Sequence, residues 1–138
     1  MNIAFFLIPK SQVSFIYSDN TFRQGLEKLR RSGFTAIPVL DRDGTYVGTV
    51  TEGDFLWSIV DVGGATMQDC ENLDVRDIVR TDRHPAVRIT ANVFELHDSL
   101  IDHNFVPVTD DRNCFMGIVT RHTLLEYFRR EAPGRGVQ

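Results

Sequence analysis

The stretch Ile37-Pro38-Val39-Leu40-Asp41, followed after a short turn by Tyr46-Val47-Gly48-Thr49-Val50-Thr51, decides the fold because the chain repeats it. The second version is Val106-Pro107-Val108-Thr109-Asp110, followed by Phe115-Met116-Gly117-Ile118-Val119-Thr120. The prolines at 38 and 107 are 69 positions apart, and the aspartate, glycine and last threonine keep that offset. A duplicated unit usually buries its core against its copy. The sequence therefore predicts two similar halves, with any ligand site in the cleft between them and in two unequal versions.

The composition is that of an ordinary globular protein. The 138 residues suffice for one core or for two small halves that share one. A formal net charge of -4, without a long basic run, argues against a general nucleic-acid binder. The apolar start, residues 3–8, stops at Pro9 and lacks a basic leader, so neither a signal peptide nor a membrane span is expected. Cys70 and Cys114 are far apart, which favours reduced thiols in a cytoplasmic protein.

Local patterns predict the order strand, helix, strand, strand, helix in each half. Thr21-x-x-Gln24 has the form of a capping box before an amphipathic helix that ends near Gly33. The strand over 35–40 contains Pro38 and is expected at a sheet edge or with an irregularity. In the second half the link from the helix to this strand is two residues shorter, so the upstream offset is about 71.

These elements predict an α+β fold with the two sheets packed back to back, not a doubly wound parallel sheet. We expect residues 1–64 to form the first repeat with an N-terminal segment. Residues 65–131 would form the connector and the second repeat, and residues 132–138 a flexible tail.

The pattern Pro-Val-x-Asp, a turn and then Gly-x-Val-Thr-x-x-Asp resembles the CBS domain, over about residues 12–127 and in both copies. The resemblance implies a pseudo-twofold pair of repeats that binds adenine nucleotides and regulates another protein. The segments 33–38 and 120–122 are also similar to those of small stand-alone bacterial CBS pairs that bind cyclic di-AMP. AMP, ADP and ATP are the next ligands that the resemblance implies.

The resemblance implies two clefts, each built from both halves. In family members the strand segments hold adenine through main-chain hydrogen bonds and apolar contact, and the Thr-x-x-Asp turn holds phosphate and ribose. The residues implied for the first cleft are Gln12, Val13, Ser14, Phe34, Thr35, Ala36, Pro38, Thr120, Arg121, His122 and Thr123. Those implied for the second cleft are Thr51, Glu52, Asp54, Arg83, His84, Asn104, Phe105 and Val106.

Thr51 and Asp54 have two explanations that can both hold. A threonine N-cap with an acid three residues later stabilises a helix by about 0.5–2 kcal/mol. Alternatively, Asp54 accepts two ribose hydroxyls while Thr51 and free N–H groups face a phosphate. Glu52, next to them, argues against a dense cluster of phosphates in this cleft.

The second copy has Arg121 and His122 in the first turn of its last helix. A cation there opposes the helix dipole by about 0.3–1 kcal/mol, and a bound phosphate clamped by Arg121 would offset that cost. The alternative is an arginine that bends into water or pairs with an acid. Thr123 stands where the family has aspartate, which puts carboxylate binding of ribose in doubt.

The aromatic residues also have alternatives. Phe34 either stacks on a purine or fills the core, whereas Phe105 is expected in the core. We expect apolar residues at the N-terminus and on one helix to supply surface for a homodimer. These residues are Phe5, Phe6, Leu7, Ile8, Trp57 and Ile59.

No catalytic or metal site is expected. His97 and His103 are six apart, which does not place both on one helix face as an i, i+4 zinc pair would be. No set of acid, base and nucleophile has an assignable geometry, so we predict no enzyme and no cofactor. The prediction is a cytoplasmic regulatory module that binds an adenine nucleotide and passes its signal to a separate effector protein. The alternative is a scaffold of degenerate repeats that dimerises or binds a protein and holds no nucleotide.

Overall fold

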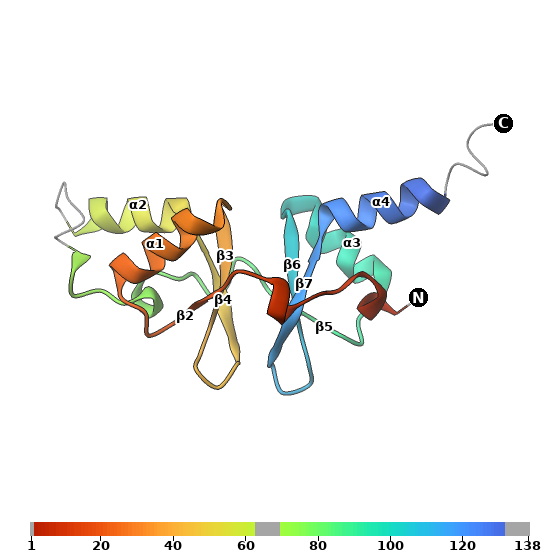
Figure 1. Ribbon diagram of the computed structural model, residues 1–138, viewed down its shortest axis with the longest axis horizontal. Coiled ribbons are helices and arrows are strands. Elements are labelled where there is room, and N and C mark those ends of the chain that lie inside the picture. Colours follow the sequence, from red (N-terminus) through yellow and green to blue (C-terminus); the bar gives the residue numbers. More distant parts are fainter. Residues whose placement is uncertain (1, 63–69, 132–138) are drawn as a thin grey trace.

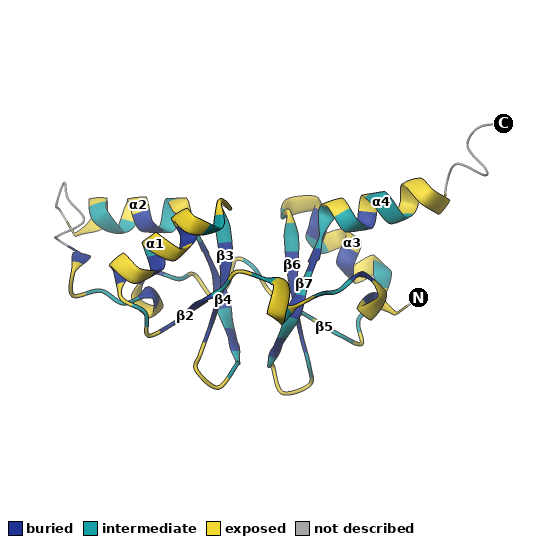
Figure 2. Cartoon of the chain, viewed as in Figure 1, coloured by how far each residue is buried: buried dark blue, intermediate teal, exposed yellow. Residues whose placement is uncertain are grey.

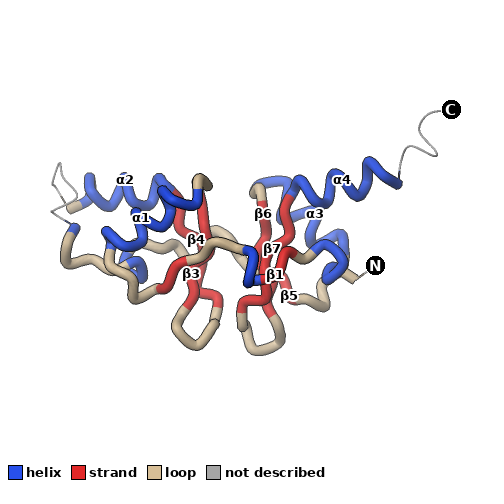
Figure 3. The backbone as a smooth tube through the Cα atoms, viewed as in Figure 1, coloured by secondary structure: helices blue, strands red, loops and turns tan. Residues whose placement is uncertain are grey.

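The computed structural model describes residues 2–62 and 70–131, so the predicted tail at 132–138 and the start of the connector lie outside the described residues. Two halves, each with helices and strands, lie side by side, with their strands facing each other at the centre and their helices outside (Figures 1 and 3). The predicted α+β class and the element order of both repeats are confirmed. None of the described helices is long and apolar enough to cross a bilayer.

Each half has one sheet covered by two helices. The first half contains β2 (Ile16–Tyr17), α1 (Phe22–Ser32), β3 (Ala36–Leu40), β4 (Tyr46–Thr51) and α2 (Glu52–Asp61). The second half contains β5 (Val87–Arg88), α3 (Val93–Asp102), β6 (Phe105–Thr109), β7 (Phe115–Thr120) and α4 (Arg121–Glu131). The sheet orders are β2-β3-β4 and β1-β7-β6-β5, where β1 is Ile8–Pro9.

The predicted caps of α1 are confirmed. The hydroxyl of Thr21 accepts from the N–H of Gln24 at 3.1 Å, and the Gln24 side chain accepts from the N–H of Thr21 at 2.9 Å. Gly33 ends the helix with a φ of 73°, a left-handed conformation that glycine adopts without steric cost.

Of the two alternatives for the strand that contains Pro38, a sheet edge or an irregularity, the structure has the irregularity, a register shift against β4 between Val39 and Leu40. β3 lies between β2 and β4. Pro38 fits there because the short β2 pairs only with Val39 and Leu40, which leaves the start of β3 open on that side. β6 is built in the same way, since β5 pairs only with Val108 and Thr109. Each central strand therefore has an open edge at its beginning.

The N-terminal segment belongs to the core of the opposite half. Ile3 and Phe6, from a 3-10 helix at Ile3–Phe6, are buried against Leu96 and Leu124 of the second half, and β1 pairs with β7. In the same way Val75, from a 3-10 helix at Val75–Asp77, is buried in the core of the first half. The expectation that Phe6 supplies dimer surface is wrong, because this side chain is only 3% exposed; Figure 2 shows the buried faces.

The two hairpins touch near their tips. The N–H of Tyr46 donates to the carbonyl of Asn113 at 3.0 Å, and the N–H of Phe115 donates to the carbonyl of Gly44 at 2.9 Å. A third cluster of buried residues, containing Leu40, joins the halves behind these bonds. The halves are thus bonded at one end of their strands, and the open strand beginnings face each other at the other end.

Candidate functional site

A pocket of about 230 Å³ lies beside the open beginning of β3, and we call it cleft A. Its lining has apolar and neutral polar side chains but no charged group among the described residues. The lining residues are Ile8, Gln12, Val13, Ser14, Phe34, Ala36, Ile37, Pro38, Asn104, Phe105, Ile118 and Thr120.

The main chain of Ala36 faces cleft A. In the β3–β4 ladder the N–H of Glu52 donates to the carbonyl of Thr35 at 3.0 Å, so Thr35 and Glu52 form a hydrogen-bonded pair. Antiparallel pairs alternate, so the next residue, Ala36, directs its N–H and carbonyl away from β4. In the β6–β7 ladder the N–H of Arg121 donates to the carbonyl of Asn104 at 2.8 Å. By the same alternation, the N–H and carbonyl of Phe105 point away from β7.

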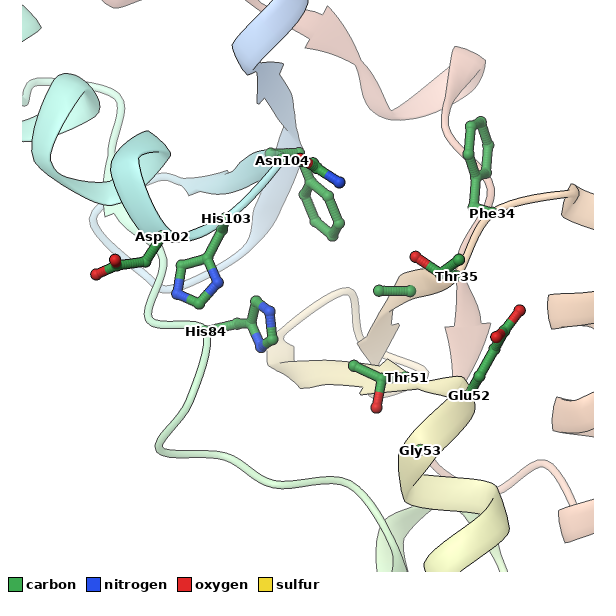
Figure 4. Close-up of a pocket in the computed structure, with 11 residues that line it drawn as sticks. Phe34, Thr35, Thr51, Glu52, Gly53, His84, Asp102, His103 and Asn104 are labelled. Atoms are coloured by element: carbon green, nitrogen blue, oxygen red, sulfur yellow. The ribbon is translucent and has the colours of Figure 1, made fainter.

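A larger pocket of about 430 Å³ lies beside the open beginning of β6, and we call it cleft B (Figure 4). Its lining is more polar than that of cleft A and contains two histidines and two acids. The lining residues are Phe34, Thr35, Ala36, Thr51, Glu52, Gly53, His84, Asp102, His103, Asn104 and Phe105.

Two histidines form one wall of cleft B. The rings of His84 and His103 lie 4.2 Å apart between centroids, and Figure 4 shows them together across the cleft from Phe34 and Glu52. Burial lowers the pKa of His84, and the neighbouring His103 lowers it further. The carbonyl of His84 accepts from the buried hydroxyl of Tyr46 at 2.7 Å, which ties this wall to the first half.

Asp54 has its carboxylate in structural bonds. One oxygen accepts from the N–H of Thr51 at 2.9 Å, and the other lies 3.7 Å from Nε of Arg80. The side chain is only 8% exposed and does not line cleft B. The capping explanation therefore accounts for Asp54, while Thr51 and Glu52 do line the cleft.

The dipole of α4 led us to expect that Arg121 binds a phosphate in cleft A. In the structure this side chain does not line cleft A. Its guanidinium donates to the carbonyls of Leu100 at 2.8 Å, Ile101 at 3.1 Å and His103 at 3.2 Å, at the carboxyl end of α3. The negative end of the α3 dipole and these three carbonyls attract the cation, so no phosphate is needed to explain its position.

The remaining predicted residues divide between the clefts and other places. Phe34 is 61% exposed and lines both clefts, so the core alternative for this side chain is wrong. Phe105, expected in the core, is half-buried and also lines both. Thr35 lines cleft B instead of cleft A. The structure places Arg83, His122, Thr123 and Val106 outside both linings.

Each of these four residues has a local reason for its place. Arg83 and His122 are exposed, and Val106 is 1% exposed in the core of the second half. The hydroxyl of Thr123 accepts from that of Thr120 at 2.8 Å, within the cap of α4.

The sequence reasoning missed several lining residues. These are Ile8, Ile37 and Ile118 in cleft A, and Gly53, Asp102 and His103 in cleft B. His103 could have been found from the repeat, because it lies 69 positions after Phe34. The described residues contain no group of three or more His, Cys, Asp or Glu side chains arranged to hold a metal ion.

The chain resembles known proteins along nearly its whole length. It is 27% identical over 121 residues to cyclic di-AMP receptor B of Bacillus subtilis (strain 168), covering 88% of this chain and 82% of the receptor. It is also 27% identical over 109 residues to a homoserine O-acetyltransferase of Methanocorpusculum labreanum, but spans only 21% of that enzyme.

The chain also resembles solved structures along most of its length. CbpB of Listeria monocytogenes in complex with c-di-AMP has a TM-score of 0.84 and 29% identity, with 94% of this chain and 96% of that chain covered. CBSX2 in complex with AMP has a TM-score of 0.76 at 21% identity, covering 94% of this chain and 97% of that one, and shares the fold. The family model described as CBS domain matches residues 7–61 and 75–130. With both repeats matched and the paired clefts in place, the chain belongs to the CBS domain family.

Proposed function

We propose that this chain is a cytoplasmic regulatory module that binds an adenine nucleotide between its two repeats, with cyclic di-AMP as the first candidate and AMP, ADP or ATP next. The observation that carries the proposal is the outward-facing main chain of Ala36 inside a neutral, largely apolar cleft. The likeness to a cyclic di-AMP receptor and to CbpB bound to c-di-AMP supports the first candidate.

The main chain of Ala36 can distinguish adenine from guanine. Adenine presents an amine donor beside a ring-nitrogen acceptor, which matches one carbonyl and one N–H on the same strand edge. Guanine presents a carbonyl acceptor beside a ring N–H donor, so both contacts would be mismatched. A mismatch leaves buried polar groups unpaired, which costs about 1–3 kcal/mol for each group.

Arg121 has no part in this proposal. Its guanidinium would have to leave three carbonyls at the carboxyl end of α3 before it could contact a phosphate in cleft A. Cyclic di-AMP is therefore the first candidate because of the likeness to its receptors, and no arginine clamp is invoked.

The module would signal by population shift. A ligand that contacts both repeats favours one relative arrangement of them, and a partner recognises that arrangement. Exposed apolar side chains on α2 and α4, namely Leu56, Trp57, Leu125 and Phe128, offer surface for a homodimer or for a separate effector protein.

A thermal-shift panel tests the ligand class. We expect cyclic di-AMP or another adenine nucleotide to raise the melting temperature, and the matching guanine nucleotides to raise it much less. Calorimetry would then give the affinity and the number of sites. An equal response to adenine and guanine compounds would contradict the base assignment.

A substitution at Ala36 tests the main-chain contact. Ala36→Pro removes the N–H that faces the cleft and leaves the β3–β4 ladder intact, since that N–H does not point toward β4. We expect affinity to fall about tenfold or more, from the lost bond and the added ring. Ala36→Gly keeps the N–H and is the matched control, with an affinity within about threefold of wild type.

The exposed apolar residues of α2 and α4 also favour a second function, a scaffold that holds no nucleotide. Under that alternative no adenine compound would raise the melting temperature at saturating concentration, and the wild type and Ala36→Pro would dimerise equally.

A further inference from the structure

Cleft B has two histidines where cleft A has two apolar side chains. His84 lies 71 positions after Val13, the offset between β2 and β5, and His103 lies 69 positions after Phe34, the offset between β3 and β6. Val13 and Phe34 line cleft A, and His84 and His103 line cleft B. The duplication therefore places an imidazole pair on one side of the pseudo-twofold axis and an apolar pair on the other.

The imidazole pair is held in position by its surroundings. The ring of His84 packs against that of His103 at 41° and runs nearly parallel to Phe105, with 6.5 Å between the centroids. The main chain of His84 is fixed by the hydroxyl of Tyr46, which also bonds to Thr49 at 2.8 Å. These contacts place both imidazoles side by side in the wall of cleft B.

One nitrogen of this pair has no hydrogen-bond partner within residues 2–62 and 70–131. Nδ1 of His84 is buried and has no hydrogen-bond partner among the described residues. Buried polar atoms in native proteins are usually paired, and an exception calls for an explanation. Burial and the neighbouring imidazole both lower the pKa of His84, so this ring is neutral at neutral pH without a ligand.

We propose that His84 and His103 bind a phosphate group of an adenine nucleotide in cleft B and that the pair takes up a proton as the nucleotide binds. The inference rests on the proposed function, because it requires a nucleotide between the repeats. Among the described residues that line cleft B there is no lysine or arginine, so an imidazolium is the cation that this lining can offer.

The other charged groups around the pair are acidic on balance. They are Glu52 and Asp54 on α2, Asp102 at the end of α3, Arg83 beside His84, and Arg80, which pairs with Asp54. A neighbouring carboxylate favours the protonated imidazole, and a bound phosphate favours it further.

The sign of the pH dependence follows from this. The phosphate raises the pKa of the pair in the complex, so the complex holds more protons than the free protein. Affinity at cleft B should therefore increase as the pH falls and decrease as the pH rises. Cleft A has no histidine or acid among its described lining residues, so its affinity should not follow the pH in this way.

Calorimetry of the full chain with cyclic di-AMP at pH 6, 7 and 8, in buffers of different ionisation enthalpy, tests the inference. The phosphodiesters and adenines of this ligand keep their charge in that range. We expect proton uptake, with an affinity up to about tenfold tighter for each unit of pH decrease. Adenosine, which has no phosphate, should bind without proton uptake.

Variants assign the proton to the pair. His103→Gln should remove most of the uptake, whereas His97→Gln, at an exposed position of α3 outside cleft B, should retain it. If a substitution prevents folding, the imidazole proton resonances of the wild type can be titrated with pH in the presence and absence of cyclic di-AMP. They report directly whether the histidines take up a proton when the nucleotide binds.

The outcomes separate the two proposals. Binding of cyclic di-AMP without proton uptake, or uptake that persists in His103→Gln, would overturn the role of the pair and leave the nucleotide-binding function standing. Failure of cyclic di-AMP, AMP, ADP, ATP and adenosine to bind at any pH would overturn the proposed function itself.

Discussion

Replacing Arg121 with alanine is expected to destabilise the second repeat and to leave nucleotide affinity nearly unchanged. The guanidinium donates to the carbonyls of Leu100, Ile101 and His103 over distances of 2.8 to 3.2 Å. Alanine removes all of these donors at once and leaves the carboxyl end of α3 without side-chain partners there.

The size of the effect follows from these contacts. A hydrogen bond to a charged group contributes about 1.5–3 kcal/mol, and the three here share one half-buried side chain, so they do not add fully. The favourable interaction with the α3 dipole and the unfavourable one with the α4 dipole are each about 0.3–1 kcal/mol and largely cancel. We expect a loss of about 2 kcal/mol in the free energy of unfolding, or roughly 5–10 °C in Tm.

Urea unfolding followed by circular dichroism measures the stability, and calorimetry with cyclic di-AMP measures the affinity. Arg129→Ala is the matched control on the same helix, because Arg129 is exposed and has an ion pair with Glu126 at 3.5 Å. That variant should lose less than about 0.5 kcal/mol. An Arg121→Ala protein that unfolds like wild type but binds cyclic di-AMP tenfold more weakly would refute the reasoning, since the guanidinium would then serve the ligand.

Three further predictions test the packing of the two repeats. Gly117→Ala should displace β1 and cost several kcal/mol in urea unfolding, because a Cβ at this position would clash with the carbonyl oxygen of Ile8; wild-type stability would show that this contact is wrong. Phe6→Ala should lower the free energy of unfolding by about 3–5 kcal/mol because the ring is buried. Phe5→Ala, at a position 72% exposed, should lower it by less than about 0.5 kcal/mol. Equal losses would contradict the burial of Phe6 in the core of the second half. Burial raises the pKa of the Tyr46 hydroxyl, so the unfolded chain ionises first and the stability from this group, complete below about pH 10, is lost as the pH rises above it. The stability difference between wild type and Tyr46→Phe should therefore shrink between pH 8 and pH 11, and a constant difference would count against a buried phenol.

Short-range features were predictable from the sequence because their partners are close along the chain. The capping box at Thr21 and Gln24, the glycine end of α1 at Gly33 and the repeat itself all depend on residues a few positions apart. The order of elements in both repeats follows from them.

Features that depend on distant partners were not predictable in this way. Pro38 indicates an edge strand or an irregular strand, and the sequence does not decide between them because it does not reveal that β2 is too short to reach this residue. The apolar residues near Phe6 resemble a free surface until β1 is seen to cross to the other repeat. His84 and His103 are 19 positions apart and belong to different segments, so only the fold brings their rings into contact.

The position of Arg121 follows from a difference between the two repeats. In the first repeat, α1 ends at Gly33, whose N–H donates to the carbonyl of Arg30. The second repeat is two residues shorter between helix start and strand, and α3 ends at His103 in extended backbone, without a glycine cap. Its last carbonyls therefore need another donor. The position 69 residues after Glu52 is Arg121, which lies at the start of α4 beside that end and supplies the missing bonds. Arg121 is unfavourable for the dipole of α4, and its presence is explained by the bonds that it makes to the uncapped carboxyl end of α3.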